Sequence, residues 1–311
     1  MSAWASSALR LSHQRSGRAR RLWVRLFVYA VLAVFIIYFA VPLVFLLLAP
    51  SQGSSEALNA HPLQFGSIHF YWRAWSNLMT YANGQKLLLI WGLNSLIYSV
   101  AAVVLAIVIG VPAGYSIAFF RFPGRRLILL VTLIAMVVPQ NALVLPLFIG
   151  LSYLHLIGSR WGVILPSGFF PLAVVLSYIY FSTHFPRQLL GAARIDGCGE
   201  LRLFVRVVVP LTKNVLPLIA FFSFWASWVN YFLPSVILNQ VTTFSLPVGI
   251  INMSAATNAI IPSALNGGLG SPIGRPELAE AGLFSILPII IIFAFSQKFL
   301  TQSPLSGAEK T

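Results

Sequence analysis

Long apolar runs dominate this 311-residue chain and limit what it can fold into. Several runs exceed 20 residues, and a helix of about that length crosses the roughly 30 Å hydrocarbon core of a bilayer. Only 8% of the residues are charged, whereas soluble domains carry about 25%. The sequence therefore predicts a membrane protein.

Six transmembrane segments are predicted, and the expected fold class is all-α. Lipid cannot satisfy free backbone groups, and the chain lacks the alternating strands of about ten residues that form a membrane barrel. The first segment is too long for the apolar part of a cleaved signal, so we expect it to be retained. The predicted spans are residues 24–48, 87–119, 127–152, 161–183, 214–238 and 281–296.

The positions of the basic residues predict the orientation of these spans. Sixteen of the 20 Lys and Arg residues lie in the N-terminal region up to Arg25, in residues 120–126, in residues 184–213 and near the C-terminus. Cytoplasmic segments are enriched in Lys and Arg, so both termini are expected in the cytoplasm. The predicted organisation is a basic cytoplasmic tail (1–23), a first transmembrane helix (24–48), an extracytoplasmic loop (49–86), a transmembrane core (87–303) with a cytoplasmic loop at 184–213 and an extracytoplasmic loop at 239–280, and a cytoplasmic tail (304–311).

Several function classes are disfavoured by what the spans lack. No Asp, Glu, Lys or Arg lies well inside a predicted span except Arg25, near the cytoplasmic end of the first one, which disfavours a proton- or sodium-coupled carrier. The five histidines are scattered and the single cysteine, Cys198, has no ligand cluster around it, so we predict no metal site or bound cofactor. The net charge of +14 does not predict nucleic-acid binding. Such binding requires basic residues gathered on a soluble surface, whereas here they lie between apolar runs.

Neutral polar and aromatic residues remain inside the predicted spans. Amides hydrogen-bond hydroxyl groups and aromatic faces pack on the C–H side of sugars, so the set suits a neutral polyhydroxylated solute. The alternative for each residue is hydrogen bonding between helices. The predicted translocation-path residues are Asn94, Gln140, Asn141, Trp228 and Asn230.

A short amphipathic helix is predicted within the cytoplasmic loop. Pro186 suits a first helical turn, and Gly197 or Gly199 suits the helix end. Between them one narrow face repeats at i, i+3, i+4 and i+7, and such a face fits a groove on another protein. The alternative is a helix lying on the lipid surface, for which the face has few bulky residues. The face consists of Leu189, Ala192, Ala193 and Asp196.

This loop resembles the cytoplasmic "Glu-Ala-Ala, then Gly, then Ile-x-Leu-Pro" loop of ABC importer permeases. The matching residues are Gly191-Ala-Ala-Arg-Ile-Asp-Gly197 followed by Val207-Val-Val-Pro210. Other stretches between about Leu87 and Leu305 are similar to the carbohydrate-importer branch of the family, in particular to the maltose-permease G-type subunit. They are Asn94-Ser-Leu96, residues 118–126, Met136-Val-Val-Pro-Gln140, Leu145-Pro-Leu-Phe148, Trp228-Val-Asn-Tyr-Phe-Leu233 and Ser245-Leu-Pro-Val-Gly249.

The resemblance implies the ABC type I importer permease fold and a set of partners in a bacterial or archaeal inner membrane. The partners are a homologous second permease, two ATPase subunits, an extracytoplasmic solute-binding protein and membrane lipid. Residues from Pro186 to about Leu201 would form a coupling helix that docks on an ATPase subunit, which binds ATP and Mg in place of this chain. The implied coupling residues are Leu189, Gly191, Ala192, Ala193, Asp196, Gly197 and Pro210.

One coupling position departs from the family pattern, because Gly191 replaces its first glutamate. Gly in a helix interior costs about 1 kcal/mol relative to Ala, and the change removes a carboxylate. We therefore expect a weakened or rewired dock rather than an inactive subunit.

Two alternatives to a sugar permease stay open at the level of sequence. One is a permease of the same superfamily for a glycerol-phosphate ester, an amino acid or a peptide. The predicted cytoplasmic location of most basic residues favours neutral cargo over anionic cargo. The other is a membrane-bound enzyme or structural scaffold, although no nucleophile–base pair is visible in the sequence.

Overall fold

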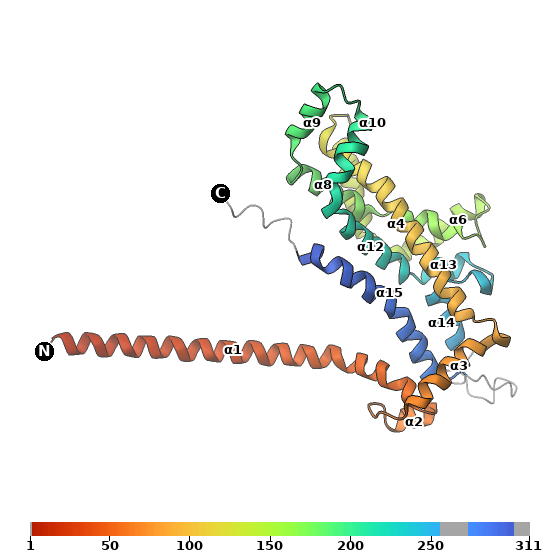
Figure 1. The fold of residues 1–311 in the computed structure, drawn as a ribbon, viewed down its shortest axis with the longest axis horizontal. Helices are drawn as coiled ribbons and strands as arrows, with labels where there is room; N and C mark the ends of the chain where they lie inside the picture. Colours follow the sequence, from red (N-terminus) through yellow and green to blue (C-terminus); the bar gives the residue numbers. More distant parts are fainter. Residues whose placement is uncertain (1, 256–272, 302–311) are drawn as a thin grey trace.

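The computed structural model describes residues 2–255 and 273–301, which form helices and no strand (Figure 1). Part of the predicted loop 239–280 and all of the predicted tail 304–311 lie outside the described residues. The first half of the chain forms α1 (Ser2–Leu48), η1 (Ala49–Ser51), α2 (Ser55–Ala60), α3 (Ile68–Gly84), α4 (Leu87–Phe119), α5 (Arg125–Val137), η2 (Gln140–Leu143) and α6 (Val144–Tyr153). The second half forms α7 (Trp161–Gly168), α8 (Pro171–Thr183), α9 (Arg187–Ile195), α10 (Glu200–Leu203), the π-helical η3 (Phe204–Val208), α11 (Val209–Leu211), η4 (Thr212–Asn214), α12 (Leu216–Trp228), α13 (Phe232–Ile237), η5 (Val241–Thr243), α14 (Leu246–Ala255) and α15 (Arg275–Thr301).

Four described helical segments are long and apolar enough to cross a membrane. They are Trp23–Ser51, Leu87–Phe119, Trp161–Thr183 and Arg275–Lys298. Two more candidates are bent pairs, one of α5 with η2 and α6 at 103° and one of residues 200–211 with α12 at 83°. The count of six spans and the cytoplasmic location of both termini stay predictions.

The predicted continuous span 127–152 is broken in the structure. Val138 and Pro139 both adopt extended backbone angles, with ψ values of 124° and 122°. A proline lacks the N–H that a helix needs and disfavours helical angles in the residue before it, which explains the break. The predicted span 214–238 is also interrupted: α12 ends at Trp228, and α13 begins at Phe232.

The centre of the bundle is α4, which packs against α7, α8 and α12. Its most extensive contact is with α8, where small residues face each other. A Cβ atom on Gly110 would lie 2.6 Å from the Cβ of Ala173, and one on Gly114 would lie 2.5 Å from the Cβ of Ser177. Small residues four apart on both helices thus bring the two backbones together, as is common in membrane helix pairs.

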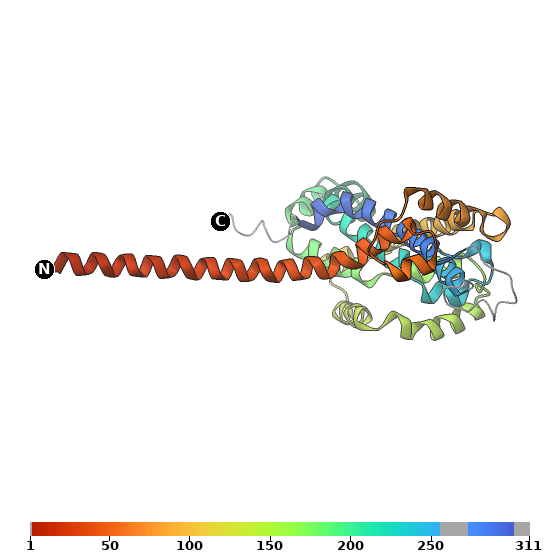
Figure 2. The same cartoon turned by 90° about the horizontal axis from the view of Figure 1, so that it is seen from below.

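The first helix lies apart from this centre. Figures 1 and 2 show α1 projecting from the bundle, which it meets near its C-terminal end at η1 and α15. The most apolar stretch of this span contains no buried residue. Its surface is therefore open to lipid or to another membrane chain.

A minimal substitution tests the α4–α8 contact. Gly114→Ala places a methyl group within 2.7 Å of the Tyr178 backbone nitrogen, whereas Gly150→Ala in α6 meets no atom within 4 Å. We expect Gly114→Ala to lower the free energy of unfolding by about 1–3 kcal/mol, because overpacking forces the helices apart. Gly150→Ala should be neutral or stabilising by up to about 1 kcal/mol. Thermal melting of the purified protein in detergent, followed by tryptophan fluorescence, measures both, and equal melting temperatures would contradict the packing described.

Candidate functional site

The amphipathic helix predicted after Pro186 is α9, which ends at Ile195. The coupling helix that the family resemblance extends to about Leu201 is therefore interrupted, because Leu201 lies in the separate helix α10. Pro186 is the N-cap of α9, and Gly197 lies just beyond its last turn with φ of +78°. The N–H of Cys198 donates to the Ala193 carbonyl at 3.0 Å and the N–H of Gly197 donates to the Arg194 carbonyl at 3.1 Å. This pair of bonds is a Schellman motif, and its positive φ explains why glycine stands at this position.

One face of α9 is seated on aromatic rings. Leu190 is 3% exposed and lies in a buried cluster, against which Ala193 also packs. The rings of this cluster come from α4, α8, the turn before α9, and η3. We call them the aromatic seat: Tyr115, Phe119, Phe181, Phe185 and Phe204.

The rings of the aromatic seat contact one another closely. The centroid of Tyr115 lies 5.5 Å from that of Phe181, and the centroid of Phe185 lies 5.6 Å from those of Phe119 and Phe181. The guanidinium of Arg187 lies 5.8 Å from the Phe119 ring centre, in cation–π geometry. The seat therefore ties α9 to the ends of α4 and α8.

The opposite face of α9 is exposed and partly apolar. Of the predicted face, Leu189, Ala192 and Asp196 are exposed, whereas Ala193 turns inward. Ile195 is 88% exposed on this face, and Leu201, which lies in α10 beyond the end of α9, is 79% exposed. Neither was among the predicted coupling residues. The sequence signal for the buried face was the size of Leu190 and Phe185. Both side chains are buried, and Ile195 is left on the exposed side of the helix.

One ion pair links α9 to α10 in the described part of the chain. Arg194 Nε donates to Glu200 Oε1 at 2.8 Å, and this hydrogen bond raises the pKa of Arg194 above its usual value. Gly191 is exposed, and a Cβ atom there would meet nothing within 4 Å. The position where the family pattern has glutamate is thus free to hold a larger side chain.

A separate cavity of about 480 Å³ lies where three helical segments are interrupted. These interruptions are the break between α5 and η2, the break between α7 and α8 at Phe169–Phe170, and the break between α12 and α13. Non-helical backbone at membrane depth is tolerated where it lines a cavity or lies buried in protein. The interruptions therefore mark this cavity as a candidate site.

The cavity lining is neutral. Three of the five predicted translocation-path residues line it, namely Gln140, Asn141 and Asn230, with Ser167 and Ser227 beside them. Phe169, Phe170 and Phe232 add aromatic surface, and no charged residue is part of the lining. Amide and hydroxyl groups among aromatic rings can orient a hydroxylated solute.

The structure places the other two path residues elsewhere. Asn94 Nδ2 donates to the carbonyls of Thr242 and Phe244 at 2.8 and 3.1 Å, and Trp228 Nε1 donates to the Ser285 carbonyl at 2.9 Å. Both side chains are buried. They hold helices and loops together, which was the alternative interpretation of these polar groups.

The last predicted coupling residue, Pro210, lies in α11 and not on α9. It follows the π-helical turn of η3, and Tyr180 donates from its hydroxyl to the neighbouring Leu211 carbonyl at 2.6 Å.

Within residues 2–255 and 273–301, no group of three or more His, Cys, Asp or Glu side chains could hold a metal ion.

Comparison with known proteins gives one family. A family model described as binding-protein-dependent transport system inner membrane component matches residues 106–304. The arabinooligosaccharides transport system permease protein AraQ of Bacillus subtilis is 34% identical over 230 residues, which are 73% of this chain and 76% of that protein. The diacetylchitobiose uptake system permease protein NgcG of Streptomyces coelicolor is 27% identical over 280 residues, which are 90% and 87% of the two chains.

A solved structure shares the fold. A chain in the crystal structure of a bacterial ABC transporter involved in the import of the acidic polysaccharide alginate matches with a TM-score of 0.74. The two sequences are 22% identical, and the match covers 91% of this chain and 98% of the other.

Two neighbouring leucines test the seating of α9. Leu190→Ala removes a buried side chain from the aromatic seat, whereas Leu189→Ala trims an exposed one. Large-to-small changes in a core cost about 2–5 kcal/mol, so amide exchange across α9 should speed up at least about tenfold in Leu190→Ala. Leu189→Ala should leave it nearly unchanged. Hydrogen–deuterium exchange with mass spectrometry measures both, and the same exchange rate in the two variants would show that Leu190 does not anchor the helix.

Proposed function

The chain belongs to the family of binding-protein-dependent transport system inner membrane components, and on that premise we propose that it forms half of the pathway of an ATP-driven sugar importer. It is a multi-pass component of a transport system rather than an enzyme. The family implies an ATPase, a solute-binding protein and a second permease as partners. In the proposed assembly two ATPase copies hold ATP and Mg, and a homologous permease completes the pathway.

The observation that carries the proposal is the two-sided character of α9. Leu190 fixes one face to the aromatic seat, while Leu189, Ile195 and Asp196 stand free on the other. Exposed apolar side chains on a short, anchored helix suit a groove in a partner protein. An ATPase subunit with such a groove would grip the free face.

Force applied to α9 would reach the membrane helices through the aromatic seat. Phe119 is the last residue of α4, and Phe181 lies near the end of α8. Both rings belong to the same cluster as Leu190, so a displacement of Leu190 would displace the ends of both helices. The same two helices touch through Gly110 and Gly114. We expect α4, α8 and α9 to move together when the ATPase subunits close, because packed interfaces have discrete arrangements and do not deform continuously.

The proposed cargo is a neutral oligosaccharide. The neutral lining of the cavity supports this class, since a site for an anion would normally supply a cation. The relatives AraQ and NgcG carry names that refer to arabinooligosaccharides and diacetylchitobiose, which are sugars. The alternative, a glycerol-phosphate ester or another anionic solute, requires the second permease to provide the positive charge.

The experiment that tests this function is reconstitution of the complex in lipid with its cognate ATPase and solute-binding protein. ATP hydrolysis should rise when the binding protein is loaded with a neutral oligosaccharide. Asp196→Arg should reduce ATPase co-purification at least about tenfold, because a charge reversal at an interface rim opposes docking. Gly191→Glu should retain or increase co-purification, since glutamate fits the open position and gains about 0.5 kcal/mol of helix propensity.

The control for the docking test is Asp196→Asn, which removes the charge without reversing it. If Asp196→Arg leaves assembly and transport intact, α9 is not the ATPase dock. Solute turnover by the isolated chain without ATPase would instead support an enzyme.

A second test concerns the cavity. The double variant Asn141→Ala with Asn230→Ala removes two amides from the lining. Each hydrogen bond contributes about 0.5–1.5 kcal/mol, so the solute concentration for half-maximal transport should rise about tenfold. Gln85→Ala, an exposed amide outside the cavity, should change nothing. Uptake in proteoliposomes measures this concentration. An equal change in the two variants would show that the cavity is not part of the solute path.

A further inference from the structure

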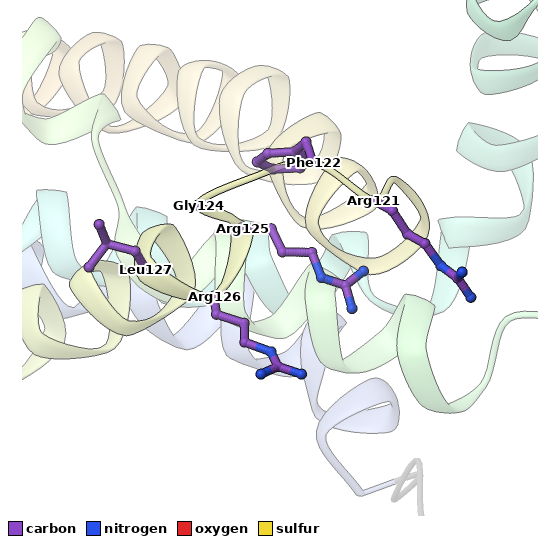
Figure 3. Close-up of a pocket in the computed structure, with 6 residues that line it drawn as sticks. All are labelled: Arg121, Phe122, Gly124, Arg125, Arg126 and Leu127. Atoms are coloured by element: carbon purple, nitrogen blue, oxygen red, sulfur yellow. The ribbon is translucent and has the colours of Figure 1, made fainter.

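Three arginines gather at the turn between α4 and α5. This turn, residues 120–126, is called here the arginine loop. Arg121, Arg125 and Arg126 line an open depression of about 660 Å³, together with Phe122, Gly124 and Leu127. Figure 3 shows the three guanidinium groups directed to the same side of the loop, while Phe122 and Leu127 point away from them.

A hydrogen bond and a ring contact hold the arginine loop in place. Arg125 Nη1 donates to the Phe120 carbonyl at 3.3 Å, and the Phe120 ring packs edge-on against Tyr115 with centroids 5.6 Å apart. Gly124 adopts φ of +85° and caps α5 without a side-chain hydrogen bond. The first backbone N–H groups of α5 therefore add partial positive charge beside the three arginines.

No carboxylate neutralises this charge in the described part of the chain. The ion pair recorded among residues 2–255 and 273–301 joins Arg194 to Glu200 and does not involve the arginine loop. Arg121 and Arg126 are exposed. Three guanidinium groups with free donors form a fork geometry that matches phosphate oxygens.

The helix that follows the loop has an apolar, open surface. No residue of α5 is buried, and Leu127, Val131 and Val137 are among its exposed side chains. Such a surface at the end of a spanning segment suits acyl chains, and the arginines next to it then lie at headgroup depth. A phosphate ligand with acyl chains attached satisfies both surfaces at once, whereas a soluble protein satisfies only the charged one.

We propose that the arginine loop binds the phosphate of an anionic phospholipid, whose acyl chains lie along α5. Arg125 and Arg126 hold the phosphate from the start of α5, and Arg121 approaches it from the end of α4. The loop joins α4 directly to the bent span, so a lipid bound there fixes the end of α5 against the helix that carries the aromatic seat.

The test compares two charge-matched variants of the full chain in its purified complex. Arg125→Gln with Arg126→Gln removes two cations from the loop, and Arg202→Gln with Arg206→Gln removes two exposed cations from α10 and η3. Native mass spectrometry counts the dioleoyl phosphatidylglycerol molecules retained, with dioleoyl phosphatidylcholine as the neutral probe. Basic residues near a membrane surface attract anionic lipid, so the loss of two of them should lower retention about tenfold or more in the loop variant only.

The outcomes separate the sources of phosphate and the classes of partner. The variant Arg125→Lys with Arg126→Lys keeps both charges and should preserve much of the lipid binding. The unmodified complex should retain more phosphatidylglycerol than phosphatidylcholine, and this comparison does not depend on how any variant folds. Equal loss in both double variants, or no loss in the loop variant, overturns the proposal. Displacement of the lipid by millimolar inorganic phosphate points to a free-anion site, and loss of ATPase or second permease with lipid retention intact points to a protein contact; either result also overturns it.

Discussion

Gly110 and Gly114 allow the backbone of α4 to touch α8 at Ala173 and Ser177, and much of the molecule depends on that contact. Lipid offers no hydrophobic force between helices, so close approach and the dispersion it permits must hold the pair together. The contact places the ends of α4 and α8 side by side. Their rings can then form the aromatic seat on which α9 rests.

The N-terminal half of α4 forms hydrogen bonds to irregular backbone in a neighbouring segment. Trp91, Asn94 and Tyr98 lie on one helical face and donate to carbonyls of residues 241–244, while Ser95 accepts from the N–H of Leu246. These bonds replace the water that the segment would otherwise need. The interruptions of α5–η2, α7–α8 and α12–α13 line the cavity described above. The irregular segment 241–246, in contrast, has its backbone groups bonded to polar side chains of α4.

Sequence reasoning predicted the parts that follow from local rules. The long apolar runs gave spans close to 24–48 and 87–119. Pro186 gave the start of α9, and of the two glycines predicted as its end the structure uses Gly197. It did not separate Asn94, which bonds backbone, from Asn141, which lines the cavity, because both are amides in apolar runs and only tertiary packing distinguishes them. The exposure of Ile195 likewise depends on which face Leu190 buries, and helical periodicity alone leaves that choice open.

In the proposed mechanism α4, α8 and α9 move as one rigid unit, which transmits motion from an ATPase subunit to the membrane helices. Spin labels at Gln188→Cys, an exposed position on α9 outside the proposed docking residues, and at Val104→Cys, an exposed position on α4, report on the rigidity of this unit in a Cys198→Ser background. The distance between the labels, measured by pulsed electron spin resonance in the reconstituted complex, should stay the same with and without ATP. A change in that distance on ATP binding would show that α9 hinges independently of α4, and the proposed transmission through the aromatic seat would be wrong.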